Sequence, residues 1–432
     1  MTTFTEAPSI ALDLARVRAQ FPSLAQTVHG NPAAFFDGPG GTQVPQRVID
    51  AMSEYLRRDN ANSGGKYATS QRTDAMVAAA RDAMGDFFHC DADEVVFGQN
   101  MTSLTFTFSR AIGRELKPGD EIVVTRLDHD ANVSPWLTMA EDRGVTVRWA
   151  EIHDEDCTLD LADLASKING KTKLVAVGYA SNAVGTINPV KEIVRLAHNV
   201  GALAYIDAVH YTPHGLIDVQ ALDCDFLVCS TYKFFGPHMG VLFGKREHIE
   251  RLQPYKVRPL TDAIPFRWEH GTPNHECIAG ITACVDYIAE LGRSSGIREA
   301  GNREAELTNR RAAIEAAYTA IHEHERCLLE QAMAGLRTIP GLRIYGITDP
   351  ARFRDRCSTL AIRIEGHAPA ELATKLGERG FFTWDGNYYA INLTDHLGVE
   401  KSGGFLRIGL VHYNTAEEVD RLIAALREIV GA

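Results

Sequence analysis

The chain has 432 residues, of which 45% are hydrophobic and 23% charged, a composition typical of a soluble globular protein large enough for two domains. Its formal net charge of −12 argues against nucleic acid or a membrane as partner, because anionic phosphates favour basic surfaces. No apolar stretch approaches the roughly 18 residues of a membrane span, and no secretory leader is visible. The eight cysteines show no Cys-x-x-Cys spacing, so we expect free thiols, no metal site and a cytoplasmic location.

The first two thirds of the chain alternate between helical and β-rich segments. Amphipathic helices are expected at about 45–58 and 73–89, on either side of a loop rich in Gly and Asn. Further helices are expected from Thr102 and near Ala131. Short β-rich runs lie between the helices, at 94–97, 121–124, 145–149, 173–177, 202–206 and 225–229. This alternation predicts an α/β fold with a mostly parallel sheet covered on both faces.

The last third of the chain has a different pattern. A segment rich in Glu, Arg and Ala predicts one long charged helix or a helix pair from about 295 to 338. Shorter β-rich runs follow at 342–345, 360–364, 381–384 and 406–410, with helices expected from Ala368 and Thr415. We therefore expect an N-terminal arm over 1–30, a large domain over 31–295, and a linking helix with a smaller α+β domain over 296–432.

Lys233 is the most informative single residue. It closes the stretch Ser230-Thr231-Tyr232-Lys233, which follows the buried run 225–229 and precedes a Gly-rich turn at 236–240. A lysine that forms a Schiff base must be neutral, and burial near other cations lowers its pKa enough to make it so. A lysine that extends into solvent at the end of a strand is the ordinary alternative, and Lys233 alone does not exclude it.

Other polar residues also follow predicted strands, where open α/β sheets bind ligands. Asp207 ends the run 202–206 and can keep a pyridinium nitrogen protonated. His129 follows the strand that ends at Thr125, and its imidazole can stack on a planar cofactor and move protons. The alternatives are a capping aspartate and an ordinary loop histidine.

Two further segments add an anion site and an amide. Residues 100–103 open a helix, where free amides and a hydroxyl group bind anions. Asn182 follows another strand and can form a hydrogen bond with a phenolic oxygen. Plain helix capping and turn formation before Gly185 are the respective alternatives.

As an ordered set, these motifs resemble those of the fold-type I enzymes dependent on pyridoxal phosphate (PLP) in the class V aminotransferase and cysteine desulfurase superfamily. The chain is most similar to the group usually called cysteine desulfurase-like. The resemblance runs from about Phe36 to the C-terminus and is carried by 36–41, 128–132, 180–186, Asp207, 230–233 and 271–274. It implies a large PLP-binding domain with a smaller C-terminal domain, PLP as cofactor, an amino acid as substrate, and a homodimer with shared active sites.

The resemblance also implies roles for individual residues. Lys233 would form the Schiff base and move protons at the substrate α-carbon, Asp207 would pair with the pyridine nitrogen, and His129 would stack on the ring. The other implied cofactor contacts are Met101, Thr102, Asn182, His210, Ser230, Tyr232 and Thr272, the last reaching the phosphate of the neighbouring subunit. Substrate contacts are implied for Gly40, Gly41 and Arg407, and Arg407 would clamp the carboxylate.

Three departures from the desulfurase pattern bear on the reaction. His210 stands where desulfurases carry a glutamine, and Tyr232 where they usually carry a histidine. Segment 385–393, where a desulfurase carries the cysteine that attacks sulfur, contains no cysteine, which argues against persulfide chemistry. The loop 62–67 also differs, and we hypothesise from charge alone that Lys66 and the segment 256–258 recognise an acidic group on the substrate.

The sequence therefore leaves several reactions open. A carbon–sulfur lyase that acts by β-elimination and a transaminase are the leading interpretations. An epimerase, with Tyr388 as the second acid, and a PLP-binding protein without catalysis are the alternatives. The presence of Lys233, Asp207 and Arg407 together argues against an inert site.

Overall fold

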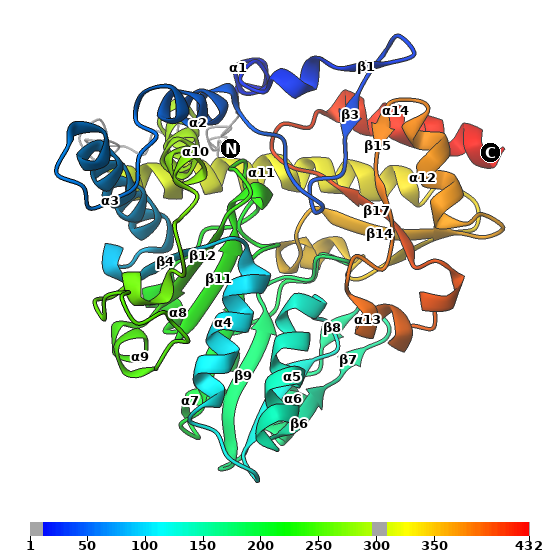
Figure 1. The fold of residues 1–432 in the computed structure, drawn as a ribbon. Coiled ribbons are helices and arrows are strands. Elements are labelled where there is room, and N and C mark those ends of the chain that lie inside the picture. Colours follow the sequence, from blue (N-terminus) through cyan, green and yellow to red (C-terminus); the bar gives the residue numbers. More distant parts are fainter. Residues whose placement is uncertain (1–11, 296–308, 432) are drawn as a thin grey trace, which may run out of the picture.

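The computed structural model describes residues 12–295 and 309–431, which build one large and one smaller sheet with helices packed around them (Figure 1). The large sheet has seven strands in the order β4-β12-β11-β10-β9-β5-β6. In that order the strands are Val95–Gly98, Gly240–Gly244, Phe226–Ser230, Leu203–Asp207, Thr172–Gly178, Glu121–Thr125 and Thr146–Ala150. β12 alone runs in the direction opposite to the other six strands, so the mostly parallel sheet is confirmed.

Alternate residues of the central strands pack into two separate hydrophobic cores. In β9 and β10, Val175 and Ile206 belong to one core, whereas Ala176 and Tyr205 belong to the other. Because successive side chains of a strand point to opposite faces, this division shows that both faces of the sheet are covered, as the sequence predicts. Within the described residues, no helix combines the length and apolar character that crossing a membrane requires.

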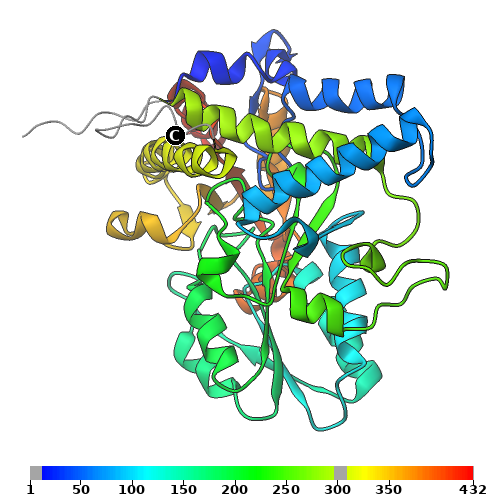
Figure 2. The same cartoon turned by 90° about the vertical axis from the view of Figure 1, so that its left-hand side faces the viewer.

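The helices of the large domain follow the predicted alternation. They are α2 (Gln46–Arg58), α3 (Ala68–Phe88), α4 (Met101–Gly113), α5 (Ser134–Arg143), α6 (Leu161–Lys167), α7 (Val190–His198), α8 (Val219–Leu222), α9 (Arg246–Arg251) and α10 (His275–Ser294). Helix α10 lies alongside α2 and α3 (Figure 2). Helix α3 begins five residues before the predicted 73, because the Ser70 hydroxyl group bonds to Gly65 N and Asn62 O and ties its first turn to the preceding loop.

The described part of the smaller domain begins with the long helix α11 (Arg310–Leu336); most of the predicted stretch before it, 296–308, lies outside the described residues. Its sheet has the order β13-β14-β17-β16, with strands Leu342–Tyr345, Thr359–Ile364, Phe405–Gly409 and Trp384–Gly386. Helices α12 (Pro369–Gly377), α13 (Ile391–His396) and α14 (Ala416–Val430) complete it. The predicted helices from Ala368 and Thr415 begin one residue later, each with the predicted residue as its N-cap.

Short strands connect the two ends of the chain. The predicted strand 381–384 is divided, because β15 (Phe381–Phe382) pairs with β3 (Ala34–Phe35) while β16 joins the small sheet. Phe36 also packs in the small-domain core. The remaining short elements are α1 (Leu14–Arg18), β1 (Thr27–Val28), β2 (Asn31–Pro32), β7 (Ile152–His153) and β8 (Thr158–Leu159). Because 34–36 pack with the C-terminal domain, the boundary at residue 31 remains a prediction.

Candidate active site

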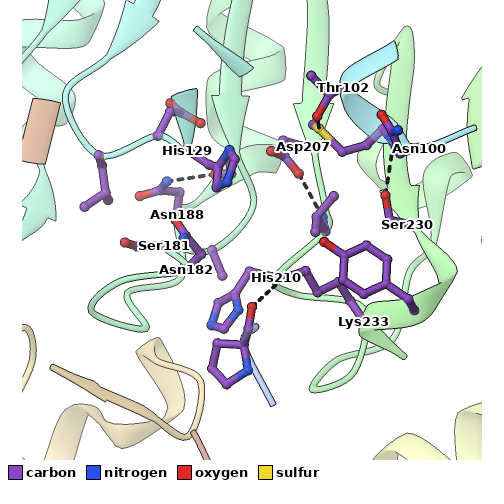
Figure 3. A pocket seen from close by; sticks show the side chains of 18 of the residues that line it. Asn100, Thr102, His129, Ser181, Asn182, Asn188, Asp207, His210, Ser230 and Lys233 are labelled. Carbon is purple, nitrogen blue, oxygen red and sulfur yellow. Dashed lines mark hydrogen bonds between the residues drawn. The ribbon is translucent and has the colours of Figure 1, made fainter. Parts of the chain in front are cut away.

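A cavity of about 580 Å³ opens beyond the carboxyl ends of β9, β10 and β11 (Figure 3). Strand register brings these ends level, since Asp207 is paired with Gly178 on one side and Val228 on the other. Nine of the predicted cofactor residues line the cavity, namely Met101, Thr102, His129, Asn182, Asp207, His210, Ser230, Tyr232 and Lys233. The fold thus gathers residues that are far apart in the sequence at the edge of the sheet where ligands are expected.

Lys233 lies in a 3₁₀ turn that follows β11 directly. Its Nζ atom donates to the backbone oxygens of Pro39 and Gly40, the second at 3.1 Å. Burial and the nearby Arg407 guanidinium lower the pKa of the Lys233 amine to about 7, although Asp207 and Asp37 act in the opposite direction. A large share of this amine is therefore neutral near pH 7, as attack on an aldehyde requires.

Asp207 ends β10 and is buried at the base of the cavity. Its Oδ1 atom accepts a hydrogen bond of 2.9 Å from Val209 N. Burial raises the pKa of the carboxyl group to about 6, against the lowering effects of that bond and of the Lys233 charge. An anionic Asp207 at neutral pH suits a partner that carries a proton, such as a pyridinium nitrogen.

His129 stands at the start of the loop after β5. Its Nδ1 atom accepts a 3.0 Å hydrogen bond from Ala131 N, so its proton is on Nε2. The ring stacks on Tyr389, with centroids 5.5 Å apart and an angle of 24° between planes. Burial, with the charges of Lys233 and Arg407, lowers the pKa of His129 to about 4. The imidazole is therefore neutral, which suits stacking on a ring better than it suits an acid.

The N-terminus of α4 supplies the predicted anion site. Asn100 caps the helix, and its Oδ1 atom accepts from Ser103 N at 2.9 Å. Met101 N donates to Ser230 Oγ at 3.0 Å, which leaves the Ser230 hydroxyl proton free to bond to a ligand. A direct bond from the Met101 amide to a phosphate would have to replace this contact, and the predicted role of Met101 remains untested. Tyr232 lines the same region and stacks on His238, with ring centroids 4.8 Å apart.

Buried polar atoms without partners face this region and show that the cavity suits a polar ligand. Asn182 donates through Nδ2 to Tyr388 O at 2.9 Å, but its Oδ1 has no partner among the described residues. Asn188 donates to Gly178 O at 2.8 Å, and its Oδ1 is likewise unpaired. Since buried polar groups are nearly always hydrogen-bonded in native proteins, these atoms indicate a bound group with donors of its own.

Arg407 is a buried cation on β17 beside the cavity. Its Nη1 atom donates to Asn182 O at 2.8 Å, and its guanidinium carbon lies 4.0 Å from the centre of the Tyr388 ring. Within 12–295 and 309–431, no carboxylate lies within ion-pair distance of it, and burial lowers its pKa to about 10. A buried guanidinium without an anion is costly, so the geometry fits a bidentate bond to a substrate carboxylate.

Arg407 and the remaining predicted contacts, Gly40, Gly41 and Thr272, are not among the residues that line the cavity. Gly40 contributes its backbone oxygen to Lys233, and a Cβ there would lie 2.5 Å from the Trp384 ring. A Cβ at Gly41 would lie 3.2 Å from the Tyr232 ring. Thr272 lines a separate cavity of about 530 Å³ that shares Gln99 and His238 with the first. The assignment of Gly40, Gly41 and Thr272 to ligands therefore remains a prediction.

The hypothesis that Lys66 and segment 256–258 recognise an acidic group of the substrate gains no support from the structure of a single chain. Lys66 is exposed and does not line the cavity. Lys256 is engaged locally, because its Nζ atom donates to Leu260 O at 2.7 Å and lies 3.3 Å from Asp262. Val257 and Arg258 are exposed on the same loop.

Sequence reasoning missed several residues of the site. Asp37 lies in the motif 36–41, but the sequence assigns no role to its carboxyl group. Burial raises the pKa of that group to about 6, against the lowering effects of the nearby Arg407 and Lys233. Asp128 lines the cavity next to Asp207, and burial raises its pKa to about 7. Asn188 precedes a proline and looks like an ordinary turn residue. Only the spatial arrangement distinguishes these three from structural polar residues.

A lysine of lowered pKa, a buried aspartate and a helix N-terminus at one end of a mostly parallel sheet define a fold-type I PLP enzyme. Comparison with known proteins gives the family. The model of the Aminotransferase class-V family matches residues 34–319 and 310–422. The chain belongs to this family and is a PLP-dependent enzyme.

Proteins similar to this chain in sequence and in structure include cysteine desulfurases. Cysteine desulfurase from Pectobacterium carotovorum subsp. carotovorum is 33% identical over 430 residues, with 96% of this chain and 97% of the relative covered. A cysteine desulfurase from Thermococcus onnurineus, in its apo structure, superposes with a TM-score of 0.84 at 25% identity and complete coverage of both chains. One from Escherichia coli gives a TM-score of 0.82 at 26% identity, covering 98% of this chain and 99% of the other.

Proposed function

We propose that this enzyme is a β-eliminating lyase that acts on an amino acid with a sulfur or other leaving group at its β-carbon. The observation that carries the proposal is that no cysteine thiol lines the described cavity, although Lys233 and Asp207 line it and Arg407 contacts the lining residue Asn182. This lining supports chemistry at the α-carbon rather than sulfur transfer to a thiol of the protein.

The state of the cysteines supports this reading. All eight are free, and only Cys327 is exposed, on α11. Burial raises the pKa of the thiols at Cys90, Cys157, Cys224, Cys229, Cys277, Cys284 and Cys357. Because the thiolate is the nucleophile, these thiols, of which all but the half-buried Cys90 are buried, are poorly suited to attack substrate sulfur.

Tyrosines occupy the place where the desulfurase pattern has its cysteine. Tyr388 and Tyr389 have positive φ values of 55° and 60°, a conformation that non-glycine residues rarely adopt. Asn387 holds this turn through Tyr389 N and Glu400 Oε1. The turn places Tyr388 against Arg407 and Tyr389 against His129. Strained backbone of this kind is typical of functional sites, and here it supports a specialised substrate mouth.

The residues of the chain have separate tasks in the proposed reaction. PLP, when bound, supplies an electron sink for the α-carbon. Arg407 binds the substrate carboxylate and thereby orients the α-hydrogen. Lys233 Nζ would hold the cofactor through its aldehyde and, once released, would take the α-proton of the substrate. Asp207 would favour the protonated pyridine nitrogen, and His129 would cover the ring. Departure of the leaving group from the β-carbon would then need no thiol from the protein.

A transaminase is the second candidate, because Lys233 can also return the proton to the cofactor. The cavity offers no contact that separates the two reactions. An epimerase is less well supported, since the Tyr388 hydroxyl group donates to Phe405 O and Trp384 O and does not line the cavity. The burial that raises the pKa of Tyr388 also makes it a poor acid.

We also propose that the enzyme works as a homodimer with shared sites. Thr272 lies outside the cavity of its own chain but lines a neighbouring one that shares two residues with it. This position is consistent with a role in a second copy of the chain.

The products of the reaction test the proposed function. Holoenzyme is incubated with single amino acids, cysteine first, and pyruvate, ammonia, sulfide and alanine are measured. Elimination from cysteine consumes water and gives pyruvate, ammonia and hydrogen sulfide in equal amounts, which is the expected result for a suitable leaving group. Alanine formation would indicate desulfuration and contradict the proposal. Turnover only with an added keto acid would identify a transaminase instead.

A further inference from the structure

A second group of reactive side chains lies beside the cofactor cavity. His210 and His214 belong to the turn that follows β10, and Cys357 lies two residues before β14. One ring nitrogen of each histidine and the Sγ atom of Cys357 all lie within 4.8 Å of one another. All three residues are buried, and the two imidazole centroids are 5.2 Å apart. Two imidazoles and a thiol are the side chains that Zn²⁺ prefers.

The hydrogen bonds leave the ligand atoms available. His214 Nδ1 lies 2.7 Å from Glu325 Oε2, which places the proton on Nδ1 and leaves the lone pair of Nε2 free. Ser358 Oγ donates to the same carboxylate oxygen at 2.8 Å. His210 Nε2 is buried and has no hydrogen-bond partner among the described residues. In the same part of the chain, no hydrogen bond involves the Cys357 thiol.

The surroundings also have the room and the supporting carboxylate of a metal centre. His214, Glu325, Cys357 and Ser358 line a small cavity of about 70 Å³, which has room for a water molecule, whereas His210 lines the neighbouring cofactor cavity. A carboxylate that accepts a hydrogen bond from a metal-binding histidine is the usual outer support of such centres. Glu325 has this position: its Oε2 atom bonds to His214, and its Oε1 atom has no hydrogen-bond partner within the described residues.

We propose that His210, His214 and Cys357 bind one Zn²⁺ ion, with water as the fourth ligand and Glu325 orienting His214. Ligands of tetrahedral zinc lie about 2.0–2.3 Å from the metal and therefore roughly 3.5 Å from one another, so small side-chain adjustments close the observed spacing. Binding displaces the thiol proton of Cys357 to solvent. No reductant or oxidant is involved.

A bound ion would couple this cluster to the cofactor site. His210 lines the cofactor cavity, and Glu325 and Cys357 belong to α11 and to the segment before β14. Zn²⁺ at this position fixes the His210 ring and joins the two domains. We therefore expect metal binding to change the visible absorbance of the bound cofactor.

Metal content tests the proposal without any measurement of activity. Purified holoenzyme is equilibrated with Zn²⁺ and a weak chelator, and bound zinc is counted per chain. We expect one ion in the wild type and none in Cys357→Ser or His214→Gln, whereas Cys224→Ser, which changes another fully buried thiol, keeps the ion. Glu325→Gln is expected to weaken binding by about 10–100-fold. Retention of zinc in Cys357→Ser, or its absence from the wild type, would overturn the proposal.

Substitution with Co²⁺ provides a measurement that needs no variant. A Co²⁺ ion bound by Cys357 gives a thiolate charge-transfer band in the near ultraviolet and the visible bands of a tetrahedral ion. A wild-type spectrum without the thiolate band would also overturn the proposal, even where a variant fails to fold. The cofactor band of the wild type should shift when Zn²⁺ is added.

Discussion

At the scale of single residues, the charge on Lys233 is set by its neighbours. Burial removes water from the amine, and the Arg407 guanidinium adds a positive charge nearby, and both effects favour the neutral form. Asp207 and Asp37 oppose them but do not prevail. Arg407 would therefore influence two steps of the proposed reaction, since it is proposed to bind the substrate carboxylate and it also helps to keep the lysine neutral.

The pH dependence of cofactor loading follows from this arrangement. Only the neutral amine attacks an aldehyde, so the rate at which the apoprotein takes up PLP should rise with pH and reach half of its plateau near pH 7. In Arg407→Gln the loss of the neighbouring charge raises the pKa of Lys233, and the rise should move to higher pH. Stopped-flow absorbance measures the rate, with Arg343→Gln, a change at an exposed arginine of β13, as the control. If the uptake rate of the wild type reached half of its plateau only near the ordinary lysine pKa, the lowered pKa of Lys233 would be refuted.

Substrate binding should depend on the fork geometry of Arg407. Arg407→Lys keeps a positive charge but removes the bidentate bond, which is worth about 1.5–3 kcal/mol for a charged group, or roughly 10–150-fold in KM. The effect should be confined to substrates that carry an α-carboxylate. Steady-state kinetics with an amino acid and with its carboxamide distinguish this role, and an equal loss for both compounds would speak against carboxylate recognition.

At the scale of elements, close contact between α10 and α11 depends on Gly292. A Cβ at this position would lie 1.8 Å from Ala313 O, which is backbone and cannot move aside cheaply. Gly292→Ala is therefore expected to destabilise the protein by about 3 kcal/mol or more. Gly377→Ala, at the end of α12 with nothing within 4 Å of the added carbon, should instead stabilise by about 0.5 kcal/mol. Chemical denaturation compares the two, and similar effects would contradict the packing described.

The elements also show what periodicity alone can predict. The central strands β5, β9, β10 and β11 are predicted correctly, because buried parallel strands are continuous apolar runs in the sequence. Strand β12 was missed, since its short run lies between two glycines and looks like an extension of the turn at 236–240. The division of 381–386 between two sheets was missed as well, because it depends on pairing with residues 34–35. Long-range pairing of this kind leaves no local signal.

At the scale of the whole molecule, the ordered motifs predict the site better than any one residue does. Nine predicted cofactor residues meet at one cavity, because strand ends that are distant in the sequence lie side by side in a parallel sheet. The environments of Asp37 and Asp128 and the grouping of His210 with His214 and Cys357 were not predicted, since they arise from burial and from contacts between residues distant in the sequence. A sequence pattern carries no information on which polar atoms lose their partners.

The shared site of the proposed homodimer leads to a complementation test. Lys233→Ala chains lack the essential amine, and Thr272→Arg chains should obstruct the site of the partner subunit rather than their own. If each Thr272 serves the other subunit, refolding the two inactive variants together restores activity, because one site of the mixed dimer has both native residues. Sedimentation confirms the dimer. No recovery in a confirmed mixed dimer would show that Thr272 does not serve the second subunit.

The absence of a thiol step is most directly tested by the mass of the protein during turnover. Holoenzyme is mixed with cysteine, quenched within one turnover and analysed as the intact chain by mass spectrometry. We expect no added sulfur on any of the eight cysteines, while sulfide and pyruvate appear in solution. A chain that gains one sulfur atom, with alanine as the product, would show that a cysteine does accept sulfur and would contradict the lyase proposed here.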